Sequence, residues 1–193
     1  MDTKRLIITL LLVFAMAFPL TACGGGGDAS ASAEESTADT VVVYFSATGN
    51  TREVAEIVAE AEGADLYEIV PEDPYTEEDL DYGEARASAE QNDPSVRPGI
   101  ASDPIDLTKY KKVYIGYPIW FGQAPRIMDT FVESNEFGDC TVIPFCTSGS
   151  SPIGDTPAVL EKEAGSGSWL EGQRFSEEPD AEEIKAWVES LQR

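Results

Sequence analysis

The segment from Val41 to Glu60 constrains the fold of this chain more than any other part of the sequence. Its first residues, Val41 to Phe45, are β-branched or aromatic and typical of a buried strand, whereas a helical apolar periodicity begins at Val54. Between them lies a short loop, residues 46–51, that is rich in hydroxyl groups. Because such a loop presents backbone N–H groups and the positive end of a helix dipole at one point, we predict that it binds a phosphate group.

The same loop limits the kind of phosphate that it can hold. It contains no Lys or Arg, and it matches neither the Gly-x-Gly-x-x-Gly pattern of dinucleotide sites nor the P-loop pattern of nucleoside triphosphate sites. A phosphomonoester held by hydroxyl groups and backbone donors fits better. A simpler interpretation stays open at this point, in which the loop is a polar turn and Asn50 or Thr51 caps the helix.

The first residues of the chain have the order of an export signal. Two basic residues precede an apolar run, Leu6 to Leu20, which is shorter than the roughly 20 residues that a membrane-spanning helix needs. The run ends in Leu20-Thr21-Ala22-Cys23, which resembles the lipobox of bacterial lipoproteins. The resemblance implies that residues 1–22 are a signal peptide and that Cys23 is lipidated. An ordinary secretory signal with an incidental cysteine is the alternative.

This start divides the chain into three parts. After the signal, residues 23–40 are mostly Gly, Ala, Ser, Thr and acidic residues, a composition that cannot bury a core and is typical of a flexible tether. Residues 41–193 are long enough for one folded domain. We therefore expect a domain that is anchored by lipid at the outer face of the cell membrane.

Composition excludes several classes of function. The chain has 36 acidic and 13 basic residues, a formal net charge of −23, which disfavours nucleic acid and favours partner proteins that carry a basic patch. It contains no histidine, which excludes Ser-His-Asp and Cys-His nucleophiles and histidine-ligated metal sites, and we expect no metal. Apart from Cys23, only Cys140 and Cys146 remain, and we interpret both as buried, unpaired thiols.

Strand-like and helix-like segments alternate along the domain. Further strands are expected at residues 66–70, 112–117, 141–146 and 172–175, and helices are expected to begin near Pro125, Thr156 and Asp180. This alternation predicts an α/β fold with a parallel sheet and helices on both faces. Because ligands of such sheets bind beyond the carboxyl ends of the strands, three loops, residues 46–51, 118–123 and 147–154, are expected to meet in space.

The connection between the second and third expected strands is long. Residues 71–93 hold nine acidic residues against Arg86 alone, and residues 93–107 are broken by three prolines. We expect one helix, near residues 76–91, followed by an irregular segment.

Aromatic residues mark the loop after the third expected strand. Trp120 and Phe121 stand there beside two prolines and two glycines, within residues 116–125. Either a flat ligand stacks on these rings, or the rings pack on the domain as a hydrophobic lid. Residues 147–151, after the fourth strand, offer small side chains and donors that suit the polar edge of a planar heterocycle, although they also fit an ordinary loop.

Together the loops resemble those of a known family. Residues 46–51, Ser-Ala-Thr-Gly-Asn-Thr, resemble the Thr/Ser-x-Thr-Gly-x-Thr phosphate loop of flavodoxins, and residues 116–125 and 147–151 resemble a flavodoxin-like subgroup with Pro-x-Trp-x-Gly and Thr-Ser-Gly loops. The resemblance covers residues 41–193 and implies a flavodoxin-like, doubly wound sheet of five parallel strands with noncovalent FMN. The phosphate contacts that it implies are Ser46, Thr48, Gly49, Asn50 and Thr51. The flavin contacts that it implies are Pro118, Trp120, Gly122, Thr147, Ser148 and Gly149.

The resemblance also implies a function. A flavodoxin-like chain that is carried as a bacterial lipoprotein is expected to transfer electrons through FMN to a redox partner protein, and its long connection, residues 71–111, could cover part of the flavin edge. The chain itself would supply no catalytic residue, since the flavin carries the chemistry. Two alternatives stay open: an FMN-dependent NAD(P)H:quinone-type reductase, and a binding module that has lost the flavin.

Overall fold

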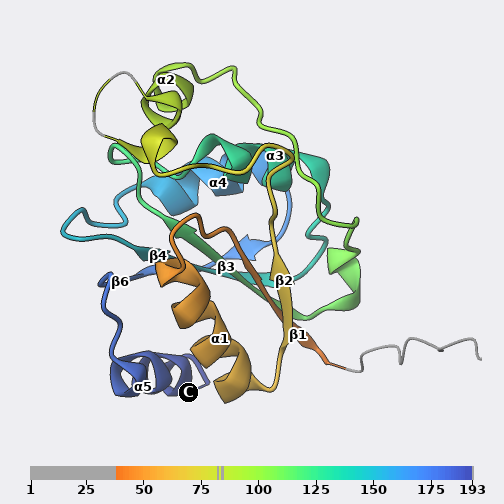
Figure 1. Ribbon diagram of the computed structural model, residues 1–193. Coiled ribbons are helices and arrows are strands. Elements are labelled where there is room, and N and C mark those ends of the chain that lie inside the picture. The colour runs from red at the N-terminus through yellow and green to blue at the C-terminus, as the bar shows by residue number, and fades with distance from the viewer. Residues whose placement is uncertain (1–37, 82, 84, 193) are drawn as a thin grey trace, which may run out of the picture. The chain divides into compact units, whose positions relative to one another are not determined.

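In the computed structural model, which describes residues 38–81, 83 and 85–192, the strands form one parallel sheet (Figure 1). The described strands are β1 (Thr40–Tyr44), β2 (Asp65–Glu68), β3 (Lys112–Pro118), β4 (Thr141–Thr147), β5 (Ser168–Trp169) and β6 (Gln173–Phe175). Their order is β2-β1-β3-β4-β5, and β6 also pairs with β4. Every pairing among them is parallel, so the predicted α/β fold with a parallel sheet is confirmed.

Helices cover both faces of this sheet. The α-helices are α1 (Asn50–Glu62), α2 (Arg86–Asn92), α3 (Arg126–Ser134), α4 (Thr156–Ala164) and α5 (Ala181–Ser190), and the short 3₁₀ helices are η1 (Glu78–Leu80) and η2 (Leu107–Lys109). Helices α1 and α5 pack together on one face, and α3 and α4 pack together on the other (Figure 1). Helix α2 lies on the side of α3 and α4.

The alternation of side chains along β1 explains the two layers. Val41 and Val43 pack with Ile127 of α3, whereas Val42 packs with Val58 of α1 on the opposite face. All of these side chains are fully buried, because a central parallel strand is covered on both sides. This is why a nearly unbroken apolar run, rather than an apolar and polar alternation, marks the strand in the sequence.

The fifth position of the sheet is divided between two short strands. The residues of β5 pair with Thr141 and Val142, and those of β6 pair with β4 from Phe145 to Thr147. The interruption lies opposite Pro144, which has no N–H to donate to a neighbouring strand. The expected strand at residues 172–175 is therefore confirmed as β6, whereas β5 was missed.

The connection between β2 and β3 differs from the prediction. A single helix over residues 76–91 is wrong, because the segment holds η1 and α2 as separate elements. Gly83 lies between them with φ 143°, outside the helical range. At the start of the segment, the Asp79 carboxylate accepts hydrogen bonds from the backbone N–H and the hydroxyl of Thr76, which ties the chain into a local turn.

The end of this connection runs along the outer edge of β2. The Ser102 hydroxyl donates to the Glu68 carbonyl at 2.6 Å and accepts from the Val70 N–H at 2.7 Å. The backbone continues the contact, since Ala101 N–H donates to the Val70 carbonyl and Pro71 forms an antiparallel bridge with Ile100. Residues 99–102 therefore occupy hydrogen-bonding groups at the edge of the sheet.

Some predictions concern residues that the structure does not describe. The signal peptide at 1–22, the lipidation of Cys23 and most of the tether at 23–40 lie outside the described residues. Within residues 38–192, as far as they are described, no helix has both the length and the apolar character needed to cross a membrane.

Candidate functional site

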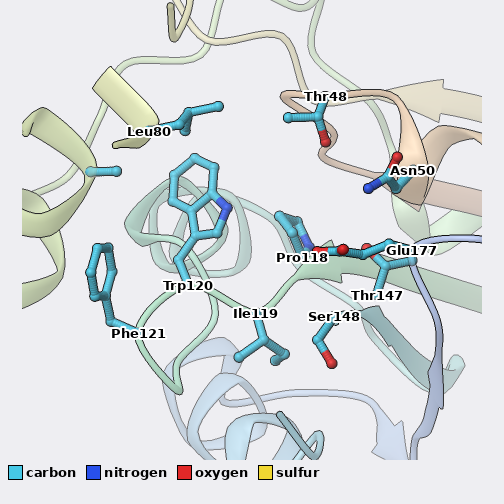
Figure 2. Close-up of a pocket in the computed structure, with 11 residues that line it drawn as sticks. Thr48, Asn50, Leu80, Pro118, Ile119, Trp120, Phe121, Thr147, Ser148 and Glu177 are labelled. Carbon is cyan, nitrogen blue, oxygen red and sulfur yellow. The ribbon is translucent and has the colours of Figure 1, made fainter. Parts of the chain in front are cut away.

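The three predicted loops meet at the carboxyl edge of the sheet. The first loop, residues 46–51, lies between β1 and α1. The second loop extends the predicted residues 118–123 to residue 125, just before α3, and the third loop, residues 147–154, follows β4. All three border one pocket (Figure 2). Its lining consists of Thr48, Asn50, Leu80, Ala87, Pro118, Ile119, Trp120, Phe121, Thr147, Ser148 and Glu177.

The first loop turns sharply at Gly49, which has φ 99°. The Gly49 N–H donates to the Ser46 hydroxyl oxygen at 3.1 Å, and the Gly49 carbonyl accepts from Glu53 N–H at the start of α1. Gly49, with no side-chain bond, is therefore the N-cap of α1, and the interpretation in which Asn50 or Thr51 caps this helix is wrong. Thr48 and Asn50 line the pocket, whereas Ser46 supports the turn.

Thr51 joins the first loop to the third. Its side chain is buried, and its hydroxyl oxygen lies 2.7 Å from that of Thr147. Thr147 also lines the pocket, but Thr51 does not. The phosphate contact assigned to Thr51 by resemblance stays a prediction, and the hydrogen bond that the structure shows gives this residue a structural role.

Arg174 of β6 holds the third loop, and the sequence interpretation missed it. Its guanidinium donates to the Ser148 carbonyl at 2.6 Å, to the Gly149 carbonyl at 3.0 Å and to the Ser148 hydroxyl at 3.0 Å. The Ser148 N–H also donates to the Phe175 carbonyl. A basic residue in the last strand of so acidic a chain was the only signal in the sequence that could have indicated this role.

The second loop contains a tight reverse turn. Phe121 has φ 50° and Gly122 has φ 79°, and two backbone hydrogen bonds of 2.9 Å join Trp120 and Gln123 in both directions. Positive φ at both central residues is the geometry of a type I′ turn, which explains the glycine. Gly122 does not line the pocket, so its predicted flavin contact stays a prediction.

The position of Trp120 agrees in part with each of the two predictions, a ring that stacks on a flat ligand and a ring that packs on the domain. Its ring meets Phe45 edge-on at 5.5 Å and Tyr75 at 5.0 Å between centroids, so part of the indole packs on the domain. The same indole lines the pocket (Figure 2). Phe121, by contrast, is 43% exposed, so it is not packed down as a lid.

Part of the lining comes from outside the three loops. Leu80 and Ala87 belong to the connection between β2 and β3, which therefore forms an apolar wall beside Trp120 (Figure 2). Glu177, which follows β6, adds a carboxylate near the third loop, and a side chain at Gly149 would lie 3.5 Å from it. Sequence reasoning expected a long connection here but could not identify these residues, because no local pattern marks them.

The described residues offer neither a metal site nor a reactive thiol. Among them, no group of three or more His, Cys, Asp or Glu side chains could hold an ion. Cys140 and Cys146 are unpaired and buried, as predicted. Burial raises the pKa of the Cys146 thiol to about 12, so this thiol is uncharged at neutral pH.

A comparison with protein families decides the identity of this fold. The family model for flavodoxin matches residues 39–191. The chain belongs to the flavodoxin family. No protein with a curated description matches this chain.

Two crystal structures of candidate flavoproteins are similar to this flavodoxin. One, from Bacteroides uniformis, is 42% identical with a TM-score of 0.74 and matches over 79% of this chain and 98% of its own. The other, from Bacteroides eggerthii, is 43% identical with a TM-score of 0.73, and the match covers 80% of this chain and 98% of its own.

A more distant structure shows the same fold. It is a flavoprotein from Lactobacillus acidophilus that was crystallised in complex with FMN, and it is 21% identical with a TM-score of 0.57. The match covers 78% of this flavodoxin and 98% of the other chain. At this identity the similarity concerns the fold.

Proposed function

We propose that this flavodoxin binds FMN noncovalently and transfers electrons. The observation that carries the proposal is the convergence of the three loops on one pocket at the carboxyl edge of the sheet. The pocket has a polar part, with Thr48 and Asn50, and an aromatic part around Trp120 (Figure 2). A phosphorylated flavin has the same division, because its phosphate is polar and its ring system is flat and mostly apolar.

The residues at the polar part fit a phosphate. Thr48 and Asn50 stand at the N-terminus of α1, where the helix dipole favours an anion. The backbone at Gly49 faces open space, since a side chain there would meet no atom within 4 Å. An anionic group can therefore approach the backbone N–H groups of the first loop closely.

The residues at the other part fit the flavin ring. Pro118 and Trp120 offer flat apolar surfaces, and Thr147 and Ser148, held by Thr51 and Arg174, place polar side chains beside them. Bound FMN supplies one-electron and two-electron transfer. The chain's own residues would orient the ring and exclude water from part of it. Among the described residues that line the pocket, only Glu177 has an ionisable side chain.

An equilibrium titration of the full chain with FMN tests this function. Binding is expected to perturb the flavin absorption bands and quench its fluorescence. Riboflavin, which lacks the phosphate, is expected to bind more weakly than FMN. The Thr48→Ala substitution is expected to weaken the binding of FMN but not that of riboflavin. Wild-type protein that stays colourless and leaves the FMN spectrum unchanged would contradict the proposal and favour a flavin-free binding module.

We further propose that the domain is anchored to the outer face of the membrane through lipidated Cys23. The order of basic start, apolar run and lipobox supports this location, and the net charge of −23 supports a redox partner with a basic patch. Expression in a bacterium fed labelled palmitate tests the anchor. Wild-type chain is expected to carry the label in the membrane fraction, and Cys23→Ser is expected to lack it. Label in both forms would contradict the proposal.

The reductase alternative has its own test. Steady-state oxidation of NADH or NADPH with a quinone by the FMN-loaded chain would favour an enzyme over an electron carrier. We propose the carrier, since no sequence pattern in the chain marks a nicotinamide site.

A further inference from the structure

One buried amide joins the connection between β2 and β3 to the second loop. Gln91 of α2 is only 3% exposed. Its amide nitrogen donates to the Ala124 carbonyl at 2.9 Å and to the Trp120 carbonyl at 3.3 Å, and its amide oxygen accepts from the Arg126 N–H at 3.1 Å. A single side chain thus bonds backbone groups before and after the reverse turn.

Arg126, directly after the second loop, bonds back to α2. Its guanidinium donates to the Gln91 carbonyl at 2.9 Å and to the Gln123 side-chain oxygen at 2.9 Å. Arg126 is the first residue of α3, where a cation opposes the helix dipole. The Asp129 carboxylate, in the first turn of the same helix, pairs with this guanidinium at 3.0 Å and offsets that effect. The guanidinium also lies 3.4 Å from the Glu90 carbonyl of α2, which accepts from the Asp93 N–H as well.

The second loop depends on such outside bonds. Phe121, with φ 50°, has a backbone conformation that costs free energy in a residue other than glycine. The two hydrogen bonds within the turn and the contacts around it offset this cost. Gln91 fixes its backbone on both sides, and Tyr75, from the same connection, packs on the Trp120 ring.

We propose that Gln91 is a positioning residue, which holds the second loop in the shape that binds the flavin ring. It does not line the pocket itself and would act through Trp120 and its neighbours. This inference rests on the proposed binding of FMN. It assigns to the connection between β2 and β3 a role in cofactor affinity beyond that of covering the pocket.

Gln91→Met tests the role, because methionine has a similar length but forms none of the three hydrogen bonds. The dissociation constants of both FMN and riboflavin are expected to rise at least roughly ten-fold, since the change acts at the ring and not at the phosphate. Hydrogen exchange at the Trp120 and Gln123 amides of the flavin-free protein is expected to become faster. Gln192→Met, the same change at an exposed position, serves as control and is expected to alter neither quantity.

Three results would overturn the inference. If Gln91→Met binds FMN and exchanges the two amides as wild type does, this inference fails while the proposed function stands. The same holds if Gln91→Met loses affinity for FMN but not for riboflavin. Wild-type protein that binds no flavin would overturn the proposed function and this inference with it. If Gln91→Met does not fold by circular dichroism, Gln91→Glu, which loses the amide donors but stays polar, replaces it with the same expected results.

Discussion

At the scale of single residues, the hydrogen bond between Thr51 and Thr147 joins two loops of the pocket. We predict that Thr51→Val lowers the free energy of unfolding by about 1 kcal/mol, because it leaves the buried Thr147 hydroxyl without this partner. Urea unfolding of Thr51→Val, Thr147→Val and the double variant measures the effect. The double variant is expected to lose less than the sum of the single losses, and strictly additive losses would contradict a direct bond.

A carboxyl group between α3 and α4 has an unfavourable environment. One oxygen of Glu163 is buried and, among the described residues, has no hydrogen-bond partner. Burial, followed by the nearby negative charge of Asp129, raises the pKa of Glu163 to about 7. The folded protein therefore binds a proton at this site more tightly than the unfolded chain does, and this site makes folding less favourable as the pH rises from 4.5 to 7.

Replacing this carboxyl group should remove its contribution to pH dependence. We predict that Glu163→Gln raises the free energy of unfolding at pH 8 by about 1–2 kcal/mol, after allowance for partial solvent exposure, and changes it little at pH 4. Denaturant unfolding across this pH range measures the difference. Glu161→Gln, on the exposed side of the same helix, is the matched control. An equal gain at both pH values would contradict the assignment.

Individual site residues were predictable only where the chain places them close together. The run Ser46 to Thr51 indicated the pocket residues Thr48 and Asn50, because a strand, a loop and a helix follow one another directly. The partner of Thr51 was not predictable, since Thr147 lies 96 residues away. The roles of Gln91 and Arg174 depend on contacts with loop carbonyl groups 33 and 26 residues away, which no local pattern specifies.

At the scale of elements, the apolar pattern predicted β1, β3 and β4 well, because a parallel strand buried on both faces is a nearly unbroken apolar run. It failed for β5, which has two residues and no period of its own. It also failed for residues 76–91, where Gly83, with φ 143°, lies between η1 and α2. Short elements are set by tertiary contacts more than by their own sequence.

The pairing of β3 with β4 allows a sharp test of packing. Gly116 lies opposite Phe145, and a side-chain carbon on Gly116 would lie 2.2 Å from the phenyl ring. We predict that Gly116→Ala lowers the free energy of unfolding by about 1–3 kcal/mol through overpacking. In the Gly116→Ala background, Phe145→Leu should lower the free energy of unfolding by less than it does in wild type, because the smaller side chain relieves the clash. Chemical denaturation of the four proteins measures this, and equal costs of Phe145→Leu in both backgrounds would contradict it.

At the scale of the whole molecule, the net charge of −23 opposes folding into a small volume. We predict that raising NaCl from about 10 to 300 mM increases the melting temperature by roughly 2–6 °C, because salt screens the repulsion between carboxylates. Thermal unfolding followed by circular dichroism measures the shift. KCl at equal ionic strength should give the same shift, and a fall in melting temperature with either salt would contradict the prediction.

The cover over β2 also affects how these molecules meet one another. An open edge of a sheet is a template on which a strand of another molecule can pair, and that pairing begins many aggregates. Residues 99–102 already bond Glu68 and Val70 at one edge. The opposite edge consists of the short strands β5 and β6, divided opposite Pro144. Within the described residues, the bonded end of β2 and the short, divided strands at the opposite edge thus offer few open positions for such pairing.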